Sequence, residues 1–287
     1  MYKKLMLTII LILSYIAASC SNQSSFEHLL YIYNKGEDGN TTLISASLNG
    51  DLEAVQYLVE NGADINNKDK DGDTALMLAS HRGDLETVQY LVENGADVNA
   101  KDNNDWTSLM YASYRGDLET VKYLIEKGAD IESKDNIGAT SLMYAAYRHN
   151  KDLVDLLIKN RANINAKDND GGTALIYSCI VGNSFGYPDL NPDIVKSLIR
   201  AGANINEIDK YGDSALLYAI YTYSIAASLD EENGENRESL LPTFATIKLL
   251  IDNGANINIR NKKGKTPLSL SKGYSKLTQL LKDNGAY

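Results

Sequence analysis

Apolar residues along the chain recur at spacings that predict pairs of short helices. Residues 75–93 carry two apolar stripes at helical spacing, formed by Leu76 and Ala79 and then by Leu85, Val88, Leu91 and Val92. Thr74 and Asp84 stand just before the two stripes, where a side-chain oxygen can cap a helix. Gly83 and Asn94-Gly95 follow them as helix stops. The pattern therefore predicts two helices joined by a tight turn.

The same pattern recurs from residue 39 to the C-terminus. The expected capping hydroxyls follow one another at intervals of 33, 33, 33, 33, 41 and 52 residues, at Thr41, Thr74, Thr107, Thr140, Thr173, Ser214 and Thr266. Two leucine columns keep the same register, namely Leu43, Leu76, Leu109, Leu142, Leu175, Leu216 and Leu268, and then Leu58, Leu91, Leu124, Leu157, Leu198 and Leu250. One helical pair leaves its apolar stripe half uncovered, so it must stack on its neighbours. We predict an all-α repeat solenoid of about seven helix-turn-helix repeats.

The repeated segments resemble a known family. Thr74-Ala75-Leu76, Gly83-Asp84 and the run from Asn94 to Ala100 match the ankyrin repeat pattern of T-P-L-H, G-H and G-A-D-V-N-A. The resemblance covers nearly all of residues 37–287. It implies an ankyrin-like stack of antiparallel helix pairs with projecting hairpin turns, and a concave face that binds partner proteins.

Several positions depart from the family pattern. The histidine of T-P-L-H is absent from every copy, which puts its local hydrogen bonding in doubt. His149 and Arg161 stand where glycine is expected, and Asp105 replaces the turn glycine equivalent to Gly72. Because aspartate tolerates left-handed backbone conformations better than most residues, we expect the turn at Asp105 to survive.

The amino terminus differs in kind from the repeats. Lys3 and Lys4 precede an apolar run, residues 5–16, which is followed by Ala17-Ala18-Ser19-Cys20. This has the form of a secretory signal and resembles the lipobox of bacterial lipoproteins. We expect a signal peptide at residues 1–19, lipid attachment at Cys20, a tether over residues 20–25 and an N-terminal capping helix over residues 26–36. The alternative is an ordinary signal peptide.

Two insertions interrupt the regular period. They fall near residues 184–191 and 223–242, each at the turn between the two helices of its repeat. We expect them either to wall one end of the binding groove or to be mobile excursions, because a longer loop costs little entropy.

Composition and residue chemistry give no signal for an enzyme. The net charge of -10 argues against nucleic-acid binding, and the short basic run Lys262-Lys263-Gly264-Lys265 fits a solvated terminal turn. His28, His81 and His149 lack metal-ligand spacing, and Cys179 fits a small buried position. We therefore expect no catalytic residues, no metal site and no cofactor.

Candidate binding residues follow from the resemblance, which places the partner surface at the hairpin tips and at the ends of the first helices. The residues at those positions that suit recognition are Trp106, Tyr114, Arg115, Ile137, Tyr147, Arg148, His81, Arg82 and Tyr211. Tryptophan, tyrosine and arginine dominate binding hot spots, because they combine large buried area with directed hydrogen bonding. Tyrosines also recur within the first helix, where they either pack between repeats or add to the groove, at Tyr111, Tyr144, Tyr177 and Tyr218.

These observations predict a membrane-tethered module that binds a protein partner through its concave face. We expect it to be monomeric, exported, and lipid-anchored in a bacterial cell envelope on the periplasmic or outer surface side. Two alternatives remain from the sequence. One is a structural or protective envelope protein without a tight partner, and the other is a secreted effector.

Overall fold

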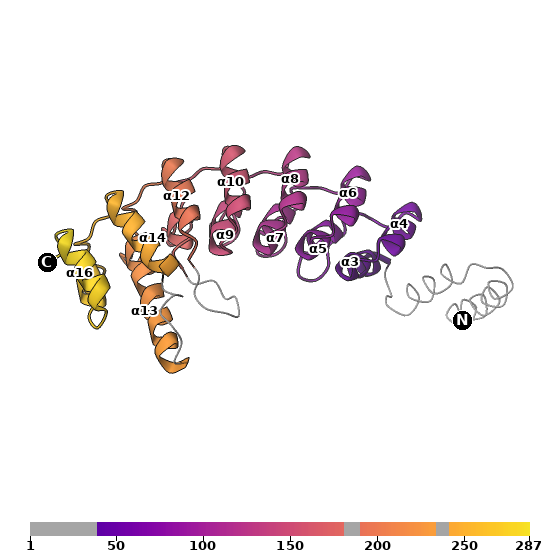
Figure 1. Cartoon of the computed structure of the whole chain (residues 1–287). Coiled ribbons are helices and arrows are strands. Elements are labelled where there is room, and N and C mark those ends of the chain that lie inside the picture. Colours follow the sequence, from indigo (N-terminus) through magenta and orange to yellow (C-terminus); the bar gives the residue numbers. More distant parts are fainter. Residues whose placement is uncertain (1–38, 181–189, 234–240) are drawn as a thin grey trace. The chain divides into compact units, whose positions relative to one another are not determined.

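The computed structural model describes residues 39–180, 190–233 and 241–287. The chain divides into two compact units, Met1–Asp97 and Val98–Tyr287. The fourteen described helices form seven consecutive pairs (Figure 1), and the only β pairing among the described residues is an isolated bridge between Ile208 and Ser214. The all-α repeat solenoid with about seven helix-turn-helix repeats is therefore confirmed.

The first unit contains two helix pairs. Their bounds are α3 (Gly39–Asn49), α4 (Leu52–Glu60), α5 (Ala75–Arg82) and α6 (Leu85–Glu93). Helix α3 packs against α4 and α5, α5 packs against α6, and α4 packs against α6. First helices therefore contact first helices, and second helices contact second helices.

The second unit continues the same arrangement through five further pairs. Their bounds are α7 (Ser108–Arg115), α8 (Leu118–Glu126), α9 (Ser141–Tyr147), α10 (Lys151–Lys159), α11 (Ala174–Tyr177), α12 (Pro192–Arg200), α13 (Ala215–Asn233), α14 (Leu241–Asp252), α15 (Pro267–Leu270) and α16 (Ser275–Asp283). Helices α7, α9, α11, α13 and α15 contact one another in sequence order, as do α8, α10, α12 and α14. A hairpin turn precedes each first helix of this unit.

Most helices begin at the expected capping residues. The Thr74 and Thr107 hydroxyls each accept a hydrogen bond of 3.3 Å from the amide three residues on, and Asp84 accepts one of 3.2 Å. These contacts satisfy amides that a helix leaves without an internal partner. Two members of the series differ. Helix α3 begins two residues before Thr41, and the Thr140 side chain makes no capping hydrogen bond.

The leucine columns form the core of each unit. In the first column every leucine from Leu43 to Leu216 is buried, and in the second Leu58 and its equivalents up to Leu250 are buried. Leu268 differs, because it is only half-buried. It belongs to the final repeat of the described chain, where no further repeat packs against that helix.

The substituted glycine positions adopt the backbone conformation that glycine would favour. Gly83 ends helix α5 at a φ of 79°, and the non-glycine residues Asp105, His149 and Arg161 have φ values of 62°, 52° and 66°. A residue with a Cβ atom adopts this left-handed region at some cost in strain. The turns therefore keep their shape despite the substitutions, as expected for Asp105.

The second insertion corrects an expectation. Residues 223–233 extend the first helix of the repeat, so that α13 runs for 19 residues. The extension is held by packing. The buried Tyr223 ring lies 6.2 Å from that of Phe244 and 5.5 Å from that of Tyr274, and the Tyr274 hydroxyl donates a 3.3 Å hydrogen bond to the carbonyl of Ser224. This part of the insertion is therefore neither a turn nor a loop.

Other expectations fall outside the described residues. They are the signal peptide (residues 1–19), the lipidated tether (20–25), the capping helix (26–36) and most of the first insertion (184–191). The last two residues of the insertion are described: Leu190 is buried, and Asn191 caps α12. None of the described helices has the length and apolar character needed to cross a membrane.

Candidate functional site

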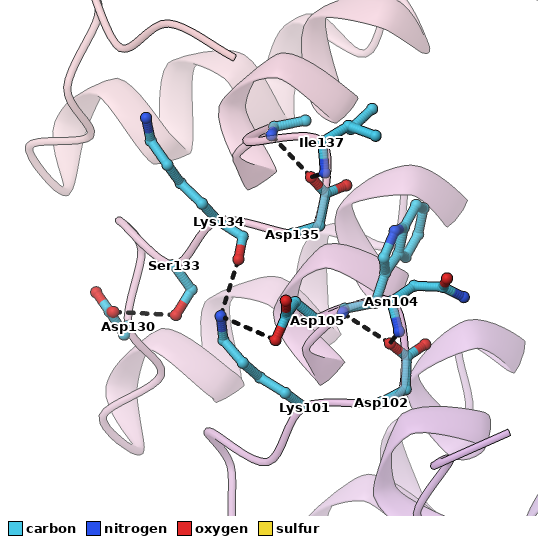
Figure 2. A network of polar contacts seen from close by, with 11 residues as sticks. Lys101, Asp102, Asn104, Asp105, Asp130, Ser133, Lys134, Asp135 and Ile137 are labelled. Atoms are coloured by element: carbon cyan, nitrogen blue, oxygen red, sulfur yellow. Dashed lines mark hydrogen bonds and ion pairs between the residues drawn. The ribbon is translucent and has the colours of Figure 1, made fainter. Parts of the chain in front are cut away.

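Four hairpin turns of the second unit each close around one aspartate, and three of these aspartates, Asp102, Asp135 and Asp209, are buried. Oδ1 of Asp102 accepts hydrogen bonds of 2.7 Å from the amide of Asn104 and 2.8 Å from that of Trp106. Oδ1 of Asp135 accepts bonds of 3.0 Å and 2.8 Å from the amides of Ile137 and Ala139, and Figure 2 shows both turns. Because one carboxylate oxygen holds two amides, the tip between them has a fixed backbone shape.

The second oxygen of the same carboxylate holds a tyrosine nine residues further along the chain. Tyr111, Tyr177 and Tyr218 donate hydroxyl hydrogen bonds of 2.8, 2.8 and 2.6 Å to Asp102, Asp168 and Asp209, and Tyr144 donates one to Asp135. Burial raises the pKa of Tyr144, Tyr177 and Tyr218, and the bond to the carboxylate raises it further. The hydroxyls therefore stay protonated as donors. This tyrosine column fastens each of these four turns to its own first helix.

Neighbouring tips are also joined along the unit. The amide of Asn136 donates a 2.9 Å bond to the carbonyl of Asn104, and the amide of Asn169 donates a 2.9 Å bond to that of Ile137. The Lys101 ammonium reaches the carbonyl of Lys134 at 2.8 Å, which Figure 2 also shows. The tips therefore present their side chains from a connected backbone.

Trp106 forms the centre of an aromatic cluster on this support. Its ring centroid lies 5.0 Å from that of Tyr111, 5.8 Å from that of Tyr114 and 4.5 Å from that of Tyr144. The rings of Tyr114 and Tyr144 are 6.0 Å apart and nearly perpendicular. Tyr144 is buried, whereas Trp106, Tyr111 and Tyr114 are half-buried. The cluster combines residues from two consecutive repeats and keeps part of its surface exposed.

Two arginines border the cluster. The Arg148 guanidinium lies over the Tyr114 ring, 5.0 Å from its centroid, in the geometry of a cation–π contact. Arg115, next to Tyr114 at the end of α7, is exposed. Tyr147 stands apart from these contacts, because its half-buried ring lies 6.3 Å from that of Tyr177.

Two tip residues expected to bind are well exposed. Ile137 and Tyr211 each keep 50% of their surface accessible. The Lys210 ammonium lies 5.1 Å from the centroid of the Tyr211 ring. Both tips thus offer apolar surface in addition to that of the cluster.

The remaining candidates lie elsewhere. His81 and Arg82 belong to the first unit, where both are exposed, and a guanidinium nitrogen of Arg82 lies 3.4 Å from the carbonyl of Leu48. Cys20 lies outside the described residues. The structure therefore assembles Trp106, Tyr114 and Arg148 into one cluster and leaves the other candidates at separate positions.

Sequence reasoning left the role of Tyr144 open and missed the aspartates beneath the cluster. The signal was available as a carboxylate and a tyrosine nine residues apart in four consecutive repeats, at Asp102 and Tyr111, Asp135 and Tyr144, Asp168 and Tyr177, and Asp209 and Tyr218. A spacing that recurs with the repeat period indicates a contact made in every copy.

Reactive groups are few in the described part of the chain. Cys179 is buried as expected, and burial raises the pKa of its thiol to about 12, so that it carries little thiolate character. A search of the described residues finds no group of three or more histidine, cysteine, aspartate or glutamate side chains able to hold a metal ion.

Comparison with known proteins identifies one matching family. The family model for ankyrin repeats, written as three copies, matches residues 13–102, 43–135, 109–187 and 142–235, which together span more than half of the chain. The comparison with curated proteins finds no match.

Proposed function

Because the chain belongs to the ankyrin repeat family, whose repeats indicate a protein–protein interaction module, we propose that it binds a protein partner through the Trp106 cluster and the adjoining hairpin tips. The observation that carries this proposal is the gathering of Trp106, Tyr114 and Arg148 into one partly exposed cluster over fixed turns. Ankyrin repeat proteins are generally non-enzymatic scaffolds, which supports recognition without catalysis.

The chemistry of the cluster suits a binding hot spot. Half-buried aromatic rings lose little rotamer entropy when a partner covers them, because their neighbours already hold them in place. Arg115 lies in the same repeat as Trp106 and offers an exposed guanidinium group. Ile137 lies in the tip of the next repeat and offers an exposed apolar side chain. One copy of the chain carries all of these groups, so a monomer is sufficient for this binding.

Capture of partners tests the site. We expect the Arg115→Ala, Ile137→Ser double variant to retain roughly a tenth or less of the wild-type capture of envelope proteins, because hot-spot residues commonly contribute 1.4 kcal/mol or more, about tenfold, each. Trp106→Ala should act in the same direction. Pulldown from envelope extract followed by quantitative mass spectrometry measures the effect.

The matched control replaces similar residues away from the cluster. Lys122 and Leu241 are exposed on α8 and α14, so Lys122→Ala, Leu241→Ser should leave capture unchanged. Equal capture by all variants would contradict the site, and broad weak capture without a hot spot would favour a structural or protective envelope protein.

We also propose that the module is exported and tethered to an envelope membrane through lipid on Cys20. The motif Ala17-Ala18-Ser19-Cys20 after an apolar run supports this. Bacteria producing the full chain should incorporate a labelled fatty acid into it, and Cys20→Ser should abolish the label, because the acyl chains attach at that cysteine. Lys272 is exposed and belongs to the final repeat, so a Lys272→Ser variant serves as the control. Label retained in Cys20→Ser would contradict the tether, and an unlabelled exported chain would favour a secreted effector.

A further inference from the structure

Charge is distributed very unevenly along the repeats. Residues 39–97 contain 11 acidic and 3 basic side chains and carry a net charge of -8. Residues 253–287 contain 7 basic and 1 acidic side chain and carry a net charge of +6. The chain as a whole carries -10. The two ends of the repeat region therefore have opposite charge.

The lysines of the final repeat are exposed and take little part in ion pairing. Six lysines there are exposed, namely Lys262, Lys263, Lys265, Lys272, Lys276 and Lys282. Within the described residues, Lys263 interacts electrostatically with Asp213, and the other five form no ion pair. In contrast, Lys167 and Lys210 pair with Glu207 and Asp170 at 2.5 and 2.7 Å. We call these six lysines the basic end.

The first unit presents a surface of the opposite sign. Helices α4 and α6 pack side by side, have the nearly identical sequences LEAVQYLVE and LETVQYLVE, and contain no basic residue. Their exposed carboxylates, with those of the turns that follow, are Glu53, Glu60, Asp64, Glu86, Glu93 and Asp97. We call these six residues the acidic face. Helix α8 differs, because Lys122 replaces the glutamine of the earlier copies.

Two equivalent turn positions of the two ends carry opposite charges. Thr74 and Thr266 both cap their first helices, and Asp69 and Asn261 both hold the amides two and four residues on. This register places Lys263 where Asp71 stands and Lys265 where Asp73 stands. The same fold element therefore offers opposite charges at the two ends of the repeat region.

We propose that the acidic face of one copy receives the basic end of a second copy, so that chains associate head to tail. A heterologous contact of this kind joins two different surfaces and can continue from copy to copy. Exposed charges attract weakly and are screened by salt, so the association is weak and strongest at low ionic strength. In dilute solution at high salt the monomer expected from the sequence is the main species. This contact is independent of the Trp106 cluster.

Two-tag capture measures the contact in the full chain. Copies carrying different tags are mixed in detergent, which keeps the apolar run of residues 5–16 in solution, and one tag is captured at about 0.03 M and about 0.5 M salt. Wild-type copies should capture each other roughly tenfold better at the lower salt, because several exposed ion pairs are screened at the higher one. Absence of salt-sensitive capture would overturn the proposal.

Charge reversal identifies the surfaces. Lys262→Glu, Lys265→Glu, Lys276→Glu and, separately, Glu60→Lys, Glu86→Lys, Glu93→Lys should each lower capture at low salt by roughly tenfold. Mixing the two variants should restore capture, because each surface then meets its opposite on the other chain. A variant that fails to fold could not be rescued in this way, and absence of rescue would count against the contact.

Two further measurements decide between sources of attraction. The control Lys122→Glu, Lys159→Glu, Lys196→Glu changes the net charge by the same amount on α8, α10 and α12, and copies of this control should capture each other normally at low salt. An equal loss of capture in this control would show that the effect depends on net charge and not on the two proposed surfaces. Binding of the basic end to phosphatidylglycerol vesicles, without copy-to-copy capture, would assign the lysines to a lipid surface instead.

Discussion

Replacing Leu124 with alanine should lower the free energy of unfolding by about 2–5 kcal/mol. The Leu124 side chain on α8 is fully buried, and its equivalents in neighbouring repeats are buried with it. Removing its branched end leaves a cavity that a closely packed stack can only partly close. Urea denaturation followed by circular dichroism measures the change as a lower midpoint.

The control lies two residues away. Lys122 is exposed on the same helix, so Lys122→Ala should change the free energy of unfolding by no more than about 0.5 kcal/mol. Each repeat is stabilised mainly by its neighbours, and the loss at Leu124 should therefore weaken the repeats on both sides. An unchanged midpoint for Leu124→Ala would contradict the core column.

Replacing Asp135 with alanine should lower the free energy of unfolding by about 2–4 kcal/mol, because buried donors are then left without an acceptor. The carboxylate accepts from the amides of Ile137 and Ala139 and from the hydroxyl of Tyr144. Ala139 and Tyr144 are buried, so water does not replace the lost acceptor without some rearrangement. Chemical denaturation measures this change as well.

Two variants separate the parts of this network. Tyr144→Phe removes one hydrogen bond to a charged group and should cost about 1.5–3 kcal/mol at most, while the turn amides stay bonded. Asp135→Asn keeps a carbonyl oxygen for both amides and should cost less than Asp135→Ala. If Asp135→Asn and Asp135→Ala were equally destabilised, the turn amides would not depend on this side chain.

The fold was predictable because the same capping and core residues recur in each repeat. Thr74 and Thr107 mark helix starts and Leu76 and Leu109 mark core positions, so each copy supports the assignment of the next. Residues 223–233 have no counterpart in another copy. Whether they extend α13 depends on the packing of Tyr223 against Phe244 and Tyr274, which are distant in sequence and outside the repeated pattern.

The candidate site was predictable in its residue types and less so in its contacts. Trp106 and Tyr114 stand at positions that the family uses for partners, and the structure brings them together. The contact of Tyr114 with Arg148 joins two repeats. Aligning the repeats shows which residues are equivalent, but it does not show which non-equivalent residues of neighbouring repeats touch. Tyr147 contacts Tyr177 as the equivalent Tyr114 contacts Tyr144, but no tryptophan joins them, because Ala139 stands in that repeat where Trp106 stands in the previous one.

The way in which Asp135 holds its hairpin turn has a consequence for how specificity can change. The carboxylate binds main-chain amides at Ile137 and Ala139 and leaves the side chains of Asn136 and Ile137 out of the bonds that close the turn. A tip can therefore exchange the side chains it presents at little cost to folding. New partners can arise by substitution at the tips while the aspartate and its tyrosine keep the scaffold unchanged.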